Sequence, residues 1–272
     1  MRIFDCHIHM DLSGVTPEEF DRRLTAGGVD KAVLLSHRPA SFGGYMKTED
    51  DSAKARIGDM MKWAGASKKI VPFFWIDPLE PDAAEQVDLA AEAGAAGFKV
   101  ICNRHYPCDD IPMKIWERIA AIDKPILFHS GILYSGSPSS NYNRPANFEA
   151  LLFIPKLRFA LAHVSWPWCD ECLAVYGHWS SSKRKGFASS EMFLDATPGT
   201  PKLYRGELFN KIYNVGFDIE NNVIFGTDCV KDYSTDYLKQ ILEMDKEAFD
   251  AAGVSEAKRE KYYYGNMQRF LG

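Results

Sequence analysis

Two histidines separated by one residue end a short apolar run near the start of the chain, in Phe4-Asp-Cys-His-Ile-His9. Alternate side chains of a β-strand point the same way, so His7 and His9 would project together from the end of such a strand. Imidazole nitrogens are the commonest protein ligands of divalent metals. The spacing therefore predicts part of a metal site, and an ordinary pair of polar residues in a strand-to-loop turn is the alternative.

Three more polar residues stand where other strand-like segments end. His129 and His163 close two apolar runs, and Asp228 follows a third in Phe225-Gly-Thr-Asp228. Four of the seven histidines thus occupy such ends. Imidazoles with one carboxylate are the ligand set expected for a catalytic zinc or a similar divalent metal, with a position left for water.

The elements that must bring these residues together alternate in type. Strand-like segments cover residues 2–9, 31–36, 70–76, 97–101, 125–129, 157–163, 191–195 and 222–226. Helical patterns cover 17–26, 48–67, 81–93, 111–122, 170–177 and 205–215, with a helical tail from 234. This alternation predicts an α/β protein with a parallel sheet, closed into a single (β/α)8 barrel whose catalytic groups lie at the C-terminal ends of the strands. An open doubly wound sheet is the alternative.

Composition limits the classes of partner. The 272 residues, 46% apolar and 25% charged, read as one soluble domain over residues 1–272. A net charge of −5 argues against nucleic acid or an anionic membrane as the main partner. No apolar run reaches membrane-spanning length, and the six scattered cysteines, including the pair Cys169 and Cys172, read as free thiols. We expect a cytoplasmic protein.

The motifs resemble those of the amidohydrolase superfamily, in particular its amidohydrolase-2 branch of metal-dependent barrel hydrolases and decarboxylases. They occur in order along the chain, as Asp5-Cys-His-Ile-His9, Gly97-Phe-Lys99, Leu127-Phe-His129, Leu161-Ala-His163, Phe225-Gly-Thr-Asp228 and Gly265-Asn-Met-Gln-Arg-Phe-Leu271. The resemblance implies that His7, His9, His129 and Asp228 hold a metal. It also implies that His163 takes a second metal or acts as an acid, base or electrophile. We expect one metal, zinc first, with manganese or iron as alternatives.

Such a metal lowers the pKa of bound water from about 15.7 toward about 7 and polarises a carbonyl. Asp228 would orient that water and accept its proton, while His163 would stabilise the oxyanion or relay a proton. We expect a hydrolase acting on a small amide, lactone or ester. A non-oxidative decarboxylase of an aromatic or enoic acid fits the same ligands, and a noncatalytic metal-dependent binding protein is the third hypothesis.

Candidate substrate-binding residues lie near the strand ends. Lys99 should point into the barrel, where it would be carboxylated between two metals, pair with a substrate carboxylate, or be held by a structural acid. Trp166 offers a flat apolar wall, and Arg144 and Arg205 suit an anionic group, with packing and salt bridges as their alternatives. We expect a small-molecule substrate, carboxylated molecules included, and the 17 Phe, 12 Tyr and 6 Trp leave room for an interface between copies.

Overall fold

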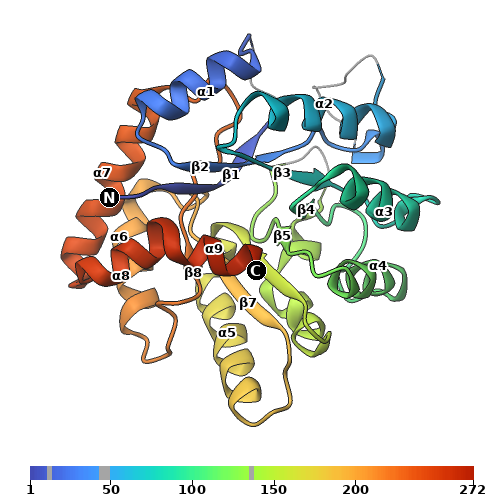
Figure 1. Cartoon of the computed structure of the whole chain (residues 1–272). Coiled ribbons are helices and arrows are strands. Elements are labelled where there is room, and N and C mark those ends of the chain that lie inside the picture. The colour runs from blue at the N-terminus through green and yellow to red at the C-terminus, as the bar shows by residue number, and fades with distance from the viewer. Residues whose placement is uncertain (11–13, 43–49, 135–137) are drawn as a thin grey trace.

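Eight parallel strands follow one another around a barrel in chain order (Figure 1). The computed structural model describes residues 1–10, 14–42, 50–134 and 138–272. The strands are β1 (Phe4–His9), β2 (Lys31–Leu35), β3 (Ile70–Trp75), β4 (Gly97–Val100), β5 (Ile126–Phe128), β6 (Arg158–Leu161), β7 (Glu191–Asp195) and β8 (Val223–Ile224). The Cys6 N–H donates to the Phe225 carbonyl at 2.9 Å and the His9 N–H to the Cys229 carbonyl at 2.8 Å. These bonds join β1 to the β8 segment, so the predicted barrel is confirmed.

Helices surround the sheet (Figure 1). They are α1 (Pro17–Ala26), α2 (Ala53–Ala66), α3 (Ala83–Ala93), α4 (Asp110–Ala121), α5 (Cys169–Arg184), α6 (Lys202–Asn214), α7 (Thr235–Ala252), α8 (Glu256–Glu260) and α9 (Asn266–Leu271). The start expected for the second helix, at residues 48–49, lies outside the described residues; α2 is capped by Ser52, whose hydroxyl accepts from the Ala55 N–H. Among the described helices, none combines the length and apolarity needed to cross a bilayer.

Two buried layers hold the barrel together. One fills the space between strands and helices, and the other fills the lumen toward the N-terminal ends of the strands. Phe270 from α9 closes that end, because its ring lies 5.1 Å from Phe193 of β7 and 6.4 Å from Phe73 of β3. Gly97 makes room for Phe73, since a Cβ there would stand 2.5 Å from the Phe73 ring. Apolar side chains therefore fill the lumen toward the N-terminal ends of the strands, and the polar side chains of the site lie at the C-terminal ends.

A register irregularity in β1 decides which way its histidines face. Simple alternation from Phe4 and Cys6, which lie in the lumen cluster, would place Ile8 inside as well. The pairing with β2 instead shifts between Asp5 and Ile8, and Ile8 packs in the outer layer. Such a bulge changes the parity of the strand. Before the bulge Phe4 and Cys6 face the lumen, and after it His7 and His9 do.

The sixth strand is shorter than its apolar run predicts. It ends at Leu161, and His163 lies in a tight turn over Ala162–Ser165. Positive φ values at His163 (59°), Val164 (43°) and Ser165 (57°) show that this turn is left-handed. Side chains rarely adopt that conformation, a β-branched one least of all, and it usually persists only where its surroundings fix it. The chain therefore leaves the strand direction at His163, and the turn, not the strand, sets the direction of the His163 side chain.

Candidate metal centre

His7, His9 and Asp228 converge at the C-terminal end of the barrel. One carboxylate oxygen of Asp228 lies 3.3 Å from His7 Nε2 and 3.3 Å from His9 Nε2. One donor atom from each of the three residues lies within 4.8 Å of the other two, so the group is compact enough to share a single ion. His7 is buried, while Asp228 keeps 30% of its side chain exposed. The group is therefore reachable from solvent on the Asp228 side.

His7 is oriented by a partner behind it. Its Nδ1 lies 2.7 Å from Asp195 Oδ2, and Asp195 is fully buried at the end of β7. A carboxylate can only accept here, so Nδ1 carries the proton and Nε2 presents its lone pair toward Asp228. Metal-binding histidines commonly donate their second ring nitrogen to a carboxylate in this way. The Asp195 contact thus fixes the tautomer that a ligand needs.

The same carboxylate connects to His163. Asp195 Oδ1 accepts from the Thr197 N–H at 2.8 Å, and the Thr197 hydroxyl lies 2.8 Å from His163 Nδ1. His163 Nε2 lies 4.0 Å from the second oxygen of Asp228. A continuous chain of contacts therefore links His7, Asp195, Thr197 and His163, and both imidazoles present Nε2 to Asp228.

His129 enters the site but not the three-residue group. Its ring lies 5.1 Å from the His163 ring, just beyond the end of β5. Its Nε2 lies 3.1 Å from the Ile132 carbonyl oxygen and donates a hydrogen bond to it. The family resemblance implies that His129 is one of four ligands. The structure places it beside His163 with Nε2 hydrogen-bonded, so its role as a ligand stays a prediction.

Lys99 is in the lumen, as expected from its strand position. It is fully buried, and its Nζ lies 3.2 Å from His7 Nε2. Burial lowers the pKa of Lys99 to about 8, while the carboxylates of Asp228 and Asp195 oppose this. A protonated amine so close to His7 places a positive charge beside the proposed metal position.

The ionisation states of the site suit metal binding. Burial holds the pKa of His7 well below the ordinary histidine range, and the charge of Lys99 adds to the effect. Burial likewise lowers the pKa of His163. Burial opposes ionisation of Asp228, but His7, His163 and His9 outweigh it and hold the pKa of Asp228 well below its usual range. Neutral imidazoles and an ionised carboxylate are the forms that ligate metals.

Comparison with known proteins places this chain in a family. A family model described as amidohydrolase matches residues 4–272, nearly the whole chain. The chain belongs to the amidohydrolase family. A search of curated protein sequences gives no match to it.

Three solved structures with a similar fold belong to proteins described in different ways. An uncharacterised TIM-barrel protein from Bordetella bronchiseptica has a TM-score of 0.72 at 15% identity, covering 100% of this chain and 98% of the other. A 5-carboxyvanillate decarboxylase from Sphingomonas paucimobilis has a TM-score of 0.65 at 13% identity, covering 99% and 98%. A probable 2-pyrone-4,6-dicarboxylic acid hydrolase from Acinetobacter baumannii has a TM-score of 0.61 at 12% identity, covering 100% of both. At these identities the likeness shows the shared fold.

The candidate substrate residues of this amidohydrolase divide by position. Trp166 lies next to the site, because its backbone N–H donates to the His163 carbonyl at 3.0 Å. Arg144 is half exposed and pairs with Glu171 at 2.5 Å. Arg205 is 1% exposed and donates from Nε to Asp245 at 2.6 Å and from Nη2 to the Ala196 carbonyl at 2.9 Å. Both arginines make the salt bridges considered as their alternatives, and a substrate role for either stays a prediction.

Three residues that build the site are not among those predicted from the sequence. Asp195 and Thr197 carry the contacts to His7 and His163, and Asp195 stands at a strand end, the signal that identified the histidines. Asp5 braces β1 against the β8 segment. It accepts from the Thr227 hydroxyl at 2.7 Å, the Thr227 N–H at 3.0 Å, the Tyr233 hydroxyl at 3.0 Å and the His7 N–H at 3.0 Å. These bonds hold both sides of the donor group in register.

Proposed function

We propose that the chain is a metal-dependent hydrolase that uses an activated water to cleave a small amide, lactone or ester. The observation that carries the proposal is the position of Asp228, whose carboxylate lies 3.3 Å from the Nε2 atoms of both His7 and His9. A carboxylate in contact with two imidazoles at a partly open barrel mouth can both ligate a metal and accept a proton.

The residues present fit one divalent ion, and we propose zinc. His7, His9 and Asp228 would hold it, because their donor atoms form one compact group and the Asp195 contact leaves His7 Nε2 free of a proton. A bound cation of this kind lowers the pKa of water toward about 7 and polarises a carbonyl oxygen. Manganese and iron accept the same donors. His129 is proposed as a fourth ligand that the variants below test.

The chain's own groups supply the proton movements. Asp228 accepts a proton at its carboxylate and returns it to the leaving group, because it faces His163 Nε2 and keeps 30% of its side chain exposed at the barrel mouth. His163, held by Thr197 at Nδ1, faces Asp228 with Nε2 and is placed to hydrogen-bond an oxyanion or pass a proton.

Non-oxidative decarboxylation of an aromatic or enoic acid is the second candidate, and Lys99 is the observation that favours it. Its amine is buried in the lumen 3.2 Å from His7 Nε2, and the negative charges of Asp228 and Asp195 favour its protonated form. A carboxylated substrate would give this cation an anionic partner, which buried charges require. Carboxylated amides or lactones would use the same contact.

One experiment separates the two reactions. Zinc-loaded protein is offered a panel of amides, lactones, esters and aromatic or enoic acids in water enriched in oxygen-18. The hydrolase proposal predicts one heavy oxygen in the product and no release of carbon dioxide. Release of carbon dioxide without oxygen incorporation would assign the decarboxylase. Protein that neither retains zinc nor takes it up would defeat the metal site itself.

We also propose that the protein is cytoplasmic and acts on a small molecule. Self-association through exposed aromatic side chains is a further proposal to test. All six cysteines are free, which suits a reducing compartment. The net charge of −5 disfavours nucleic acid and anionic membranes.

A further inference from the structure

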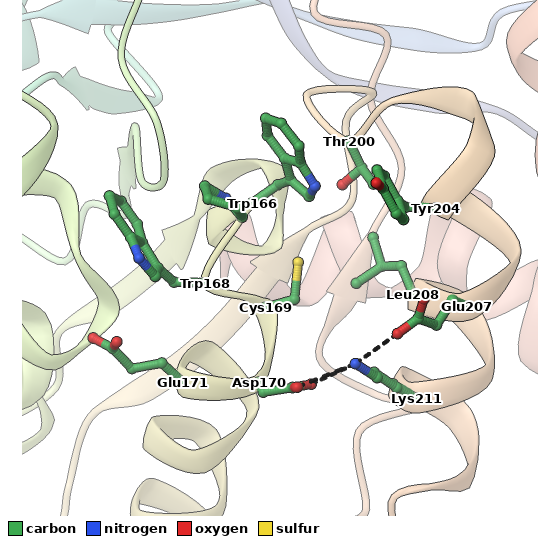
Figure 2. A pocket seen from close by; sticks show the side chains of 11 residues that line it. Trp166, Trp168, Cys169, Asp170, Glu171, Thr200, Tyr204, Glu207, Leu208 and Lys211 are labelled. Atoms are coloured by element: carbon green, nitrogen blue, oxygen red, sulfur yellow. Dashed lines mark hydrogen bonds and ion pairs between the residues drawn. The ribbon is translucent and has the colours of Figure 1, made fainter.

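A pocket lies near the metal centre, between the start of α5 and the N-terminal part of α6. It has a volume of about 480 Å³, within the range of about 300–1,000 Å³ typical of small-molecule sites. Its apolar walls are Trp166, Trp168, Tyr204 and Leu208, which Figure 2 shows arranged around the opening. None of the residues that line it belongs to the three-residue donor group. Its aromatic walls suit a flat ligand.

One buried polar atom in this pocket has nothing to bind. Thr200 is 3% exposed, and its hydroxyl has no hydrogen-bond partner among the described residues. The indole nitrogen of Trp166 points toward Thr200 and Tyr204 (Figure 2). A buried hydroxyl without a partner is costly, and polar groups in that state are uncommon in folded proteins. An amide-like group on a ligand would satisfy the hydroxyl and meet the indole N–H.

The charges around the pocket are unfavourable to anions. Lys211 is already shared between Asp170 at 2.9 Å and Glu207 at 2.8 Å (Figure 2). Glu171 is paired with Arg144 at 2.5 Å, and Arg144 also lies over the Trp168 ring at 5.0 Å. Three carboxylates thus face two cations, which leaves one negative charge in excess. An anionic ligand would find no unshared cation here, whereas a neutral or cationic ligand would not be repelled.

Two segments that form the pocket also hold His163. Gly199 precedes Thr200, and a Cβ at Gly199 would stand 2.5 Å from the His163 ring. The Trp166 N–H donates to the His163 carbonyl at 3.0 Å. The pocket is therefore a neighbour of the metal centre, because the segments that line it also contact His163.

We propose that this pocket is a second small-molecule site, selective for a flat, neutral or cationic aromatic ligand that carries an amide-like group. The ring lies against Trp166 and Tyr204, and the amide-like group binds the Thr200 hydroxyl. The inference does not rest on the proposed reaction, because it needs neither a bound metal nor turnover.

Three probes of equal ring size and different charge test it: benzamide, benzamidinium and benzoate. Binding is followed by the NMR signals of the tryptophan indole N–H groups in the full chain, with the Trp166 signal assigned from Trp166→Phe. Each titration is run on zinc-loaded and on chelator-treated protein. Benzamide and benzamidinium are expected to shift the Trp166 signal whether or not zinc is present, and benzoate to bind at least about tenfold more weakly.

Variants at Thr200 test the hydrogen bond. Thr200→Val keeps the shape and removes the hydroxyl, and it should weaken benzamide binding about five- to tenfold, the effect of one neutral hydrogen bond. Thr200→Ser keeps the hydroxyl and should retain binding, which separates this loss from misfolding. Thr25→Val, on the exposed side of α1, is the matched control and should change nothing.

Three results would each overturn the proposal. They are a Trp166 signal that no probe shifts, benzoate binding as tightly as benzamide, and shifts that vanish on chelation. The last would place the probe at the metal centre instead. Failure of the hydrolase assay leaves these readouts untouched, so the two proposals fail separately.

Discussion

Replacing Asp195 tests whether the carboxylate behind His7 controls metal affinity. Asp195 Oδ2 binds His7 Nδ1 at 2.7 Å, and Oδ1 accepts from the Thr197 N–H at 2.8 Å. Loss of such a partner typically costs about 10–100-fold in metal affinity, or about 1.4–2.7 kcal/mol. Asp195→Ala removes both acceptors, so we expect about 100-fold weaker zinc binding. Asp195→Asn keeps one oxygen for two N–H donors, so we expect a loss of about tenfold.

The assay is competition for zinc against a chromophoric chelator, with folding checked by circular dichroism and thermal unfolding. Asp59→Asn removes an exposed carboxylate on α2 and is the matched control. A folded Asp195→Ala variant that binds zinc as tightly as the wild type would refute this role for Asp195.

Three further predictions follow from other contacts. His129→Ala should retain more zinc than His7→Ala, measured by elemental analysis, because His129 lies outside the compact group of His7, His9 and Asp228; equal losses would show that His129 contributes as much as His7. Arg205→Leu should lower the free energy of unfolding in urea by about 3–5 kcal/mol, since it strands the buried Asp245 charge, while any effect confined to KM would contradict a structural role. Burial lowers the pKa of His105 in the folded protein. Just below the ordinary histidine pKa, the unfolded chain therefore binds more protons than the folded protein does. Wild-type stability should fall as pH drops below about 6.5, and His105→Asn should fall less steeply; parallel curves would contradict this.

The fold was predictable because its signals are local. Strand and helix patterns alternate along the chain, and the polar residues that end the strands mark the functional side of a barrel. His7, His9 and Asp228 were found on that rule. Asp195 obeys the same rule at the end of β7 and could have been found by applying it to carboxylates as well as histidines.

Other parts of the site depend on contacts between distant segments, which no local pattern records. The bulge in β1 changes the direction of His7 without any residue that marks it. Arg205 follows a strand-end loop like a substrate ligand, but its partner Asp245 stands 40 residues away on α7. His163 leaves its strand in a left-handed turn although its apolar run continues as if extended. In each case tertiary packing decided between readings that the sequence left open.

The group of His7, His9 and Asp228 lies where the first and last strands of the barrel meet. His7 and His9 come from β1 and Asp228 follows β8, and the bond from the His9 N–H to the Cys229 carbonyl joins the same two segments. During synthesis, the first two donors therefore emerge long before the third. The complete site can form only after the eighth strand has docked against the first, so a zinc ion captured there would act as a latch on a finished barrel. Stripping the ion should accordingly loosen the β1–β8 junction before the rest of the sheet, a local order of opening that amide hydrogen exchange would resolve.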